Sequence, residues 1–256
     1  MKRLILLLIA FVTVTFNCSA QELELPILMY HNINDEYENH NKNVEMSSQD
    51  FISQMTALKD YGYTTIFFED YINYLTYGTE LPPKPILVTF DDGYLNNYTV
   101  AYPILKQLGM KATIFIVTGR MGVDGVVTYP HFTWEQAKIM ENSGVIDIQS
   151  HTNYHGELIN LSKNDVILEL RKSKYLIEKN LNKKVIALAY PYGFSNQVVR
   201  NEARIAGYSV CVEINDKVPK VNSSTTDPFK LCRITAHGGV SGEELIKIIE
   251  GAAYEN

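Results

Sequence analysis

The stretch that decides the fold reads Ile86-Leu87-Val88-Thr89-Phe90-Asp91-Asp92-Gly93. A short apolar run rich in β-branched residues and bounded by a turn residue predicts a buried strand. Two adjacent carboxylates at the end of such a strand are costly, because like charges repel and burial penalises both of them. A metal ion or a buried arginine would relieve that cost. A turn that merely caps a loop is the plainer alternative for Asp-Asp-Gly.

Similar apolar runs recur on both sides of this stretch, with helical patterns between them. Besides Ile86–Phe90, the predicted strands are Pro26–Tyr30, Thr64–Phe67, Ala112–Val117, Ile146–Gln149, Val185–Tyr190, Ser209–Val212 and Leu231–Thr235. Strands that alternate with helices along a whole chain favour a parallel sheet. The predicted fold class is therefore α/β, a distorted (β/α) barrel with seven or eight parallel strands. An open doubly wound sheet is the alternative, although no GxGxxG or P-loop motif follows a strand.

Capping residues mark several of the intervening helices. Helix starts are predicted at Ser47, Thr133, Ser162 and Ser241. Each has a hydroxyl that can accept a hydrogen bond from a free backbone N–H of the first turn. Gly109 and Gly207 follow helical stretches and are predicted C-caps, because glycine adopts the left-handed conformation readily.

Composition limits the class of protein. The chain has 256 residues, of which 46% are hydrophobic and 20% charged, and its formal net charge is −6. These values are typical of a globular protein with a core and exclude disorder, collagen and coiled coil. The acidic balance and the lack of a long basic run argue against a nucleic-acid binder, so nucleic acid is not an expected partner.

Residues 1–20 have the three-part pattern of a secretory signal peptide. Lys2 and Arg3 precede an apolar run of 13 residues, and small residues suited to cleavage lead up to Ala20. We therefore expect a mature domain over residues 21–256 that is secreted, or located in the periplasm or cell envelope. An uncleaved anchor is one alternative. A lipoprotein acylated on Cys18 is another, and only then do we expect membrane association.

A second polar set follows the predicted strand Ile146–Gln149. It reads Ser150-His151-Thr152-Asn153-Tyr154-His155. Two histidines four residues apart share one face of a helix or converge across a tight loop. With a carboxylate they form a His₂Asp set, and three protein ligands with an open position are typical of a catalytic zinc-type site. The other loop histidines, His40 and His131, are expected to be solvated.

A third element, Ala189-Tyr190-Pro191-Tyr192-Gly193, also follows a predicted strand. Proline has no N–H, so the backbone N–H of its neighbour can point into a cleft. A Tyr-Gly turn in this position could supply an oxyanion donor and an aromatic wall. Taken alone, this segment is only a turn.

Together, Thr-Phe-Asp-Asp-Gly, Ser-His-Thr-x-x-His and Tyr-Pro-Tyr-Gly resemble the motifs of the polysaccharide deacetylases, the metal-dependent esterases of carbohydrate esterase family 4. The resemblance extends from about Pro26 to Ala252. It implies a distorted barrel and the removal of N- or O-acetyl groups from sugar polymers. Residue by residue, it implies a general base at Asp91, metal ligands at Asp92, His151 and His155, and oxyanion or substrate binding at Pro191 and the backbone N–H of Tyr192. These roles agree with the chemistry, because the metal would occupy the Asp92 carboxylate, whereas Asp91 is free to accept a proton from water.

Two departures from the family pattern matter. Many members pair the base with an arginine where this chain has Ala189, and Arg233 on the last predicted strand is our candidate replacement. An ordinary surface or helix-pairing arginine is the alternative reading of Arg233. The late Leu-x-His strand end that carries the general acid is also missing, which leaves His31 and His237 as candidates. We choose His31, because it ends a clean apolar strand as in the permuted branch of the family, which includes poly-β-1,6-N-acetylglucosamine deacetylases.

The function expected from these features is a secreted metal-dependent hydrolase that deacetylates a polysaccharide or oligosaccharide. Zinc is the expected metal, with cobalt or nickel as alternatives. A carbohydrate-binding protein with a weakened site on the same fold is the other candidate, favoured by the lost arginine at position 189. Exopolysaccharide, peptidoglycan, chitin-like oligomers and acetylated xylan all stay open as substrates, because specificity depends on loops.

Overall fold

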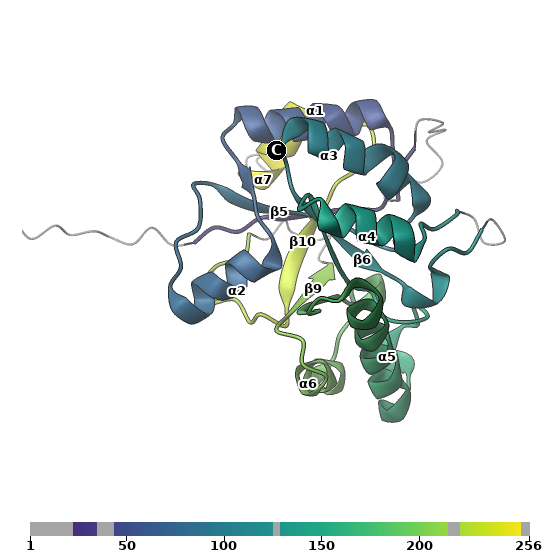
Figure 1. The fold of residues 1–256 in the computed structure, drawn as a ribbon. Coiled ribbons are helices and arrows are strands. Elements are labelled where there is room, and N and C mark those ends of the chain that lie inside the picture. The colour runs from purple at the N-terminus through teal and green to yellow at the C-terminus, as the bar shows by residue number, and fades with distance from the viewer. Residues whose placement is uncertain (1–22, 35–43, 125–128, 215–220, 252–256) are drawn as a thin grey trace, which may run out of the picture.

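The strands form a closed barrel in the computed structural model, which describes residues 23–34, 44–124, 129–214 and 221–251 (Figure 1). Its seven parallel strands are β1 (Ile27–Tyr30), β5 (Pro85–Phe90), β6 (Ala112–Ile116), β7 (Ile146–Ser150), β8 (Ala187–Ala189), β9 (Val210–Ile214) and β10 (Leu231–Thr235). The ring closes through β1, which pairs with β5 on one side and with β10 on the other. The prediction of a distorted (β/α) barrel is confirmed, and the open sheet is excluded.

The predicted strand Thr64–Phe67 lies outside the ring. Only Thr64–Thr65 is extended (β4), and it pairs with Pro85 and Ile86 at the very start of β5. Two further short strands, β2 (Asn32–Ile33) and β3 (Glu45–Met46), form a separate parallel pair just beyond β1. The barrel is therefore irregular at β4, which pairs with the start of β5 but does not belong to the closed ring.

In the described residues, seven α-helices lie around the strands (Figure 1). They are α1 (Ser48–Asp60), α2 (Phe68–Tyr77), α3 (Tyr102–Leu108), α4 (Trp134–Asn142), α5 (Lys163–Leu181), α6 (Gln197–Ile205) and α7 (Gly242–Ile249). The hydroxyls of the four predicted N-cap residues each accept a backbone N–H in the first turn of α1, α4, α5 or α7. Gly109 ends α3 in the left-handed conformation, as expected.

No helix within the described ranges has the length and apolar character needed to span a membrane.

The barrel interior is apolar in its amino-terminal half. Side chains alternate along β5, so that Leu87 joins the interior cluster while Val88 packs with the residues under the helices. Phe68 of α2 packs on Phe115 of β6, with ring centroids 5.7 Å apart, and adds to this interior cluster. Apolar side chains thus occupy the amino-terminal half, and the polar residues of the motifs lie toward the carboxyl ends of the strands.

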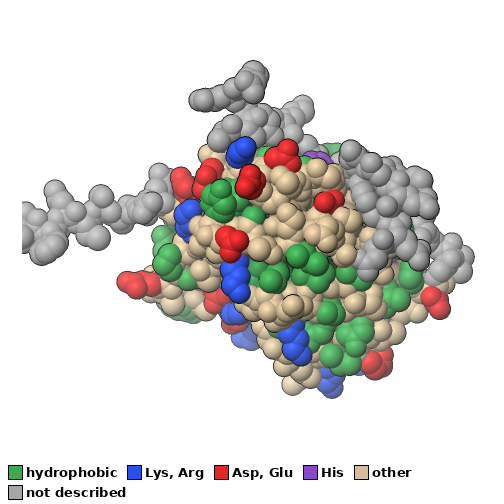
Figure 2. Space-filling model, turned by 90° about the horizontal axis from the view of Figure 1, so that it is seen from above, with side chains coloured by type: hydrophobic (Ala, Val, Ile, Leu, Met, Phe, Trp, Pro, Cys, Tyr) green, Lys and Arg blue, Asp and Glu red, His purple; other side chains and the backbone are tan. Residues whose placement is uncertain are grey.

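The surface and the cysteines fit the composition. On the face seen in Figure 2, acidic and basic side chains are interspersed with apolar ones and do not gather into a basic patch. Cys211 is buried and Cys232 is half-buried, and neither forms a disulfide.

Candidate active site

Asp91 and Asp92 lie just beyond the carboxyl end of β5. Both are buried, with 1% and 6% of their surface exposed. The backbone of Asp92 is left-handed, with φ of 71°, and Gly93 follows with φ of 83°. This turn keeps both carboxylates at the barrel end. An extended strand would not do so. Left-handed backbone costs a non-glycine residue on the order of 1–3 kcal/mol, which the surrounding structure must offset.

Arg233 is the partner of Asp91. Its side chain, on β10, is fully buried. Its Nη1 and Nη2 atoms donate to Asp91 Oδ1 and Oδ2, each at 2.7 Å, and Nη1 also lies 3.3 Å from Thr89 Oγ1. Burial would raise the pKa of Asp91, but the Arg233 guanidinium outweighs it and holds that pKa well below its usual range. Asp91 is therefore an ionised carboxylate, and the arginine missing at position 189 is supplied from another strand.

The two histidines come from a loop that follows β7. His151 Nε2 lies 3.8 Å from Asp91 Oδ2 and 3.9 Å from Asp92 Oδ1, and His155 Nε2 lies 3.4 Å from Asp92 Oδ1. His151 Nδ1 donates to the carbonyl oxygen of Ala189 at 2.8 Å, which leaves Nε2 with a free lone pair. Burial lowers the pKa of His155 to about 4, aided by the charge of His151, so this imidazole is neutral at pH 7. Neutral imidazoles are the form that binds a metal.

Asp92, His151 and His155 could hold a divalent cation. Each offers one ligand atom, and these atoms all lie within 4.8 Å of one another. Asp92 Oδ1 is buried without a hydrogen-bond partner in the described part of the chain. A buried carboxylate oxygen without a partner is unfavourable, and a cation would satisfy it. One carboxylate and two imidazoles match the donors of catalytic zinc sites, so the residues fit such an ion.

Pro191 and Tyr192 lie in a short turn, η4 (Pro191–Gly193), after β8. The Tyr192 ring packs edge-on against His155, with centroids 4.8 Å apart, while 55% of its surface stays exposed. Tyr192 has φ of 60°, and Gly193 has φ of 75°. A Cβ at position 193 would lie 2.5 Å from the Cβ of Ile214, so only glycine fits there. The turn thus brings the Tyr192 ring beside His155.

His31 directly follows β1, beside Asp91. Tyr30 pairs with Phe90, and the Asp91 N–H donates to the Tyr30 carbonyl at 3.0 Å. Desolvation lowers the pKa of His31, against the opposing effect of the nearby Asp91 and Asp92 carboxylates. Asn97, at the start of the π-helical turn η1 (Asn97–Ala101), donates its Nδ2 to the His31 carbonyl at 2.7 Å. His31 therefore lies at the same barrel end as Asp91 and Asp92.

The competing histidine, His237, lies beyond β10. Its carbonyl oxygen accepts a weak hydrogen bond from Gln54 Nε2 at 3.4 Å, and Gln54 belongs to α1. His237 is half-buried. The contacts of its main chain are thus with the helical layer.

Sequence reasoning missed part of the surroundings of Asp92. The Tyr94 hydroxyl hydrogen-bonds the Asp92 carboxylate, and burial together with that bond raises the pKa of Tyr94 far above its usual range. His131 was expected to be solvated and this is wrong, because its ring is buried and packs on Tyr94 with centroids 5.2 Å apart. An antiparallel bridge between Tyr94 and His131 draws the polar loop inward. The aromatic residues just after the Asp-Asp-Gly turn were the sequence feature that could have indicated these contacts.

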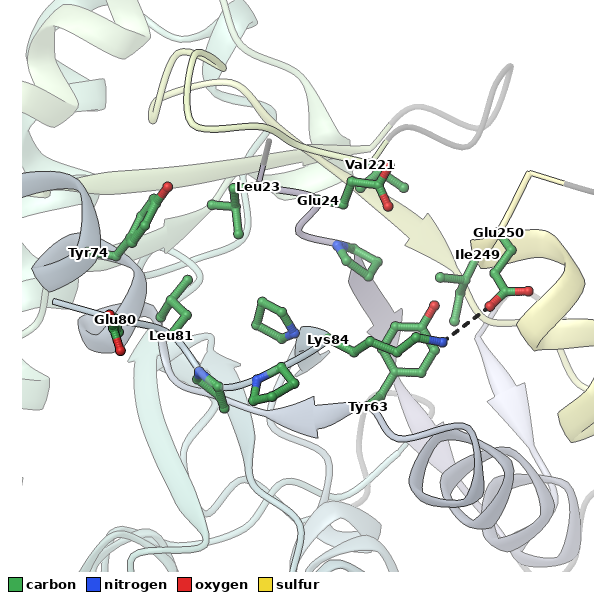
Figure 3. A pocket seen from close by; sticks show the side chains of 14 residues that line it. Leu23, Glu24, Tyr63, Tyr74, Glu80, Leu81, Lys84, Val221, Ile249 and Glu250 are labelled. Atoms are coloured by element: carbon green, nitrogen blue, oxygen red, sulfur yellow. Dashed lines mark ion pairs between the residues drawn. The ribbon is translucent and has the colours of Figure 1, made fainter. Parts of the chain in front are cut away.

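A cavity of about 680 Å³ lies at the other end of the barrel, where the strands begin (Figure 3). Prolines line much of it, together with Tyr63 and Tyr74. Lys84 and Glu250 form an ion pair at its edge, 3.6 Å apart, and Lys84 also lies over the Tyr63 ring. None of the candidate catalytic residues lines this cavity.

Comparisons with known proteins agree with the barrel and its polar end. A family model described as polysaccharide deacetylase matches residues 78–211. YxkH of Bacillus subtilis (strain 168) is 34% identical over 227 residues, covering 89% of this chain and 76% of that protein. The chain belongs to the polysaccharide deacetylase family. Membership supports a hydrolase that acts on carbon–nitrogen bonds other than peptide bonds.

Two further relatives are similar to this chain over most of its length. The poly-beta-1,6-N-acetyl-D-glucosamine N-deacetylase of Staphylococcus aureus (strain MSSA476) is 29% identical over 194 residues, covering 72% of this chain and 66% of that protein. The Streptococcus pyogenes deacetylase PplD, solved in complex with acetate, superposes with a TM-score of 0.81 at 30% identity, covering 90% of this chain and 99% of that one.

Proposed function

We propose that this chain is a secreted, metal-dependent deacetylase that removes N-acetyl groups, or O-acetyl groups, from a polysaccharide. The observation that carries the proposal is the convergence of Asp92, His151 and His155 beside the ion pair of Asp91 and Arg233. Five ionisable groups meet at one barrel end and four of them are buried, which is expensive for stability and favours a functional role.

The proposed metal ligands are Asp92, His151 and His155, and zinc suits their donor atoms, with cobalt or nickel as alternatives. A divalent cation held there would polarise the acetyl carbonyl and lower the pKa of water at the site. Ala189 orients His151 through its carbonyl, so the main chain fixes which ring nitrogen is free. The Tyr94 hydroxyl hydrogen-bonds the Asp92 carboxylate and helps to orient it.

Asp91 is the proposed general base. Arg233 holds both carboxylate oxygens in one orientation and keeps them ionised, so that Asp91 can accept a proton from water. Each oxygen still has a lone pair beyond the one that Arg233 uses. The absence of an arginine at position 189 favoured the alternative of a carbohydrate-binding protein with a weakened site. The contact of Arg233 with Asp91 removes that argument.

The oxyanion and the leaving amine need separate groups. The backbone N–H of Tyr192 is the proposed oxyanion donor, because Pro191 has no N–H and the Gly193 and Phe194 N–H groups are used within the turn. His31 is the proposed general acid for the leaving nitrogen. The lowered pKa leaves His31 mostly neutral at pH 7, so it would have to gain a proton during the reaction before donating it to the leaving amine.

The proposed substrate class is an acetylated amino-sugar polymer such as poly-β-1,6-N-acetylglucosamine. The Staphylococcus aureus relative supports this choice by its name. A polymer outside the cell requires an exported enzyme, and residues 1–20 have the pattern of an export signal. The mature chain is then expected to begin near Gln21, or at an acylated Cys18 if it is a lipoprotein. These residues lie outside the described ranges.

Acetate release tests the proposal. Purified mature protein is incubated with poly-β-1,6-N-acetylglucosamine, peptidoglycan, chitin oligomers and acetylated xylan. We expect release from at least one amino-sugar polymer, its loss after chelation, and its return when zinc, cobalt or nickel is added back.

The matched control is Asp92→Asn, which keeps the shape of the side chain but weakens the candidate ligand. It should release little acetate at limiting metal concentration. Undiminished release after exhaustive chelation would contradict metal dependence. Binding of polymers without any release from them would instead favour a carbohydrate-binding role. Mass spectrometry of exported protein tests the expected start near Gln21.

A further inference from the structure

The loop between the two candidate histidine ligands is strained and needs outside support. Thr152 has φ of 67° and His155 has φ of 60°, and left-handed backbone is unfavourable at non-glycine residues. The Thr152 hydroxyl accepts the His155 N–H at 3.1 Å, which is a bond within the loop. A strained loop persists only when its surroundings determine its shape.

One side of the loop is held by the segment after β6. The Thr118 N–H donates to the Thr152 carbonyl at 3.2 Å, and the Gly119 N–H donates to the Asn153 carbonyl at 2.8 Å. The Thr118 hydroxyl also donates to Asn153 Oδ1 at 3.0 Å. These bonds use the carbonyls of Thr152 and Asn153 and leave the N–H groups of Asn153 and Tyr154 for another partner.

That partner is Glu169, a buried carboxylate on α5 with 7% of its surface exposed. Its Oε2 atom accepts the N–H of Asn153 at 3.0 Å and the N–H of Tyr154 at 2.8 Å. Hydrogen bonds from two N–H groups to one charged oxygen are roughly twice as strong as neutral ones. Glu169 thus fixes the two peptide groups between the histidines while touching neither imidazole.

We propose that Glu169 is a positioning residue that sets the place of His155 relative to Asp92 and His151. This role rests on the metal site of the proposed function. Without the carboxylate, the two N–H groups lose their acceptor and the left-handed turn at Thr152 and His155 relaxes. His155 Nε2 then leaves the position 3.4 Å from Asp92 Oδ1, and the third ligand is lost or displaced.

Metal affinity tests this role directly. Apparent zinc affinity is measured by chelator competition, and the geometry of the site by the visible spectrum of the cobalt-substituted protein. Loss of a group that orients a metal ligand typically weakens affinity about 10–100-fold, and we expect this for Glu169→Ala. Glu169→Gln keeps an acceptor oxygen but loses the charge, so its loss should be smaller, about fivefold.

Glu202→Ala is the matched control. Glu202 is a similarly buried carboxylate (5% exposed) on the neighbouring helix α6, and its partner is Lys163 Nζ at 3.0 Å. We expect this variant to keep the zinc affinity and cobalt spectrum of the wild type even if it lowers the free energy of unfolding. Glu169→Ala should change both metal readouts while its apoprotein stays folded.

A second experiment, in His155→Ala protein, separates the positioning role of Glu169 from a direct effect of its charge on the cation. In His155→Ala protein, adding Glu169→Ala should weaken zinc binding little further, because the ligand it positions is gone. If Glu169→Ala weakens zinc binding in the His155→Ala protein as much as in the wild type, the positioning role alone is overturned. Equal zinc affinity in wild type and Glu169→Ala would also overturn it alone. If Glu169→Ala fails to fold, unchanged affinity in Glu169→Gln overturns it. Wild-type protein that binds no divalent metal would overturn the proposed function and this role with it.

Discussion

The two ends of the barrel hold their charged residues in opposite ways. At the carboxyl end, Arg233 and Asp91 are buried and joined by two hydrogen bonds of 2.7 Å. At the amino end, Lys84 and Glu250 lie 3.6 Å apart with side chains 49% and 46% exposed. Water screens the second pair, whereas the first depends wholly on its partner. The comparison teaches that burial, and not the presence of opposite charges, decides how strongly each charge depends on its partner.

The largest effect is expected for Asp91→Asn. Loss of a general base typically lowers turnover about 10²–10⁴-fold, because nothing else in the site takes the proton as well. Metal affinity should stay near the wild-type value, since Asp91 is not among the proposed ligands. Initial rates of acetate release and a zinc titration measure the two quantities. Glu250→Gln, an acid-to-amide change at the amino end, is the control, and near-normal turnover in Asp91→Asn would mean that another group activates water.

Arg233→Met should lower the free energy of unfolding most. Removing one partner of a buried ion pair leaves the other unpaired and typically costs about 3–5 kcal/mol. Urea unfolding at pH 7 measures the change. The double variant Asp91→Asn/Arg233→Met should be less destabilised than the sum of the single variants, because neither charge is then left alone. Additive effects would show that the pair is not coupled, and the contrast between the barrel ends would fail.

His31→Ala should separate amide from ester substrates. An amine must be protonated to leave, so turnover on N-acetyl substrates should fall about 100-fold or more. Activated O-acetyl esters should lose less, because their leaving groups need little protonation. His237→Ala is the control and should stay close to wild type. The reverse result, with His237 needed and His31 dispensable, would reassign the acid.

The smallest effect is expected for Lys84→Met at the amino end. Exposed ion pairs contribute about 0.2–1 kcal/mol, so the free energy of unfolding should change by no more than that. Acetate release should be unchanged, because Lys84 lies at the opposite end from the proposed base. A large loss of activity would show that the cavity in Figure 3 takes part in the reaction.

Much of the fold was predictable because the strands are short apolar runs with clear boundaries. The predicted strand 86–90 starts one residue late, and 231–235 matches β10. The strand predicted at 64–67 shrinks to Thr64–Thr65, since its last residues lead directly into α2. Periodicity cannot reveal this, because the same apolar residues serve a strand and a helix start equally well.

The candidate site was predictable in its residue types but not in its geometry. The sequence alone could offer Arg233 only as a candidate partner of Asp91, since the contact depends on the pairing of Leu28 with Ile234 across the closed ring. The left-handed backbone at Asp92 and His155 carries no composition signal, because neither residue is glycine. Glu169 is invisible for a related reason, as its contacts are to backbone N–H groups and not to any motif side chain.

The pairing of β1 with β10 also orders the assembly of the protein. Leu28 and Ile234 are 234 − 28 = 206 positions apart, and contacts between such distant residues form slowly because a long loop must close first. Arg233 lies in that last strand, so Asp91 gains its counter-charge only when the ring closes. A chain synthesised only as far as β9 has an open sheet edge and an uncompensated carboxylate at its centre. The proposed base is thus fully paired only once almost the whole chain has been made and folded.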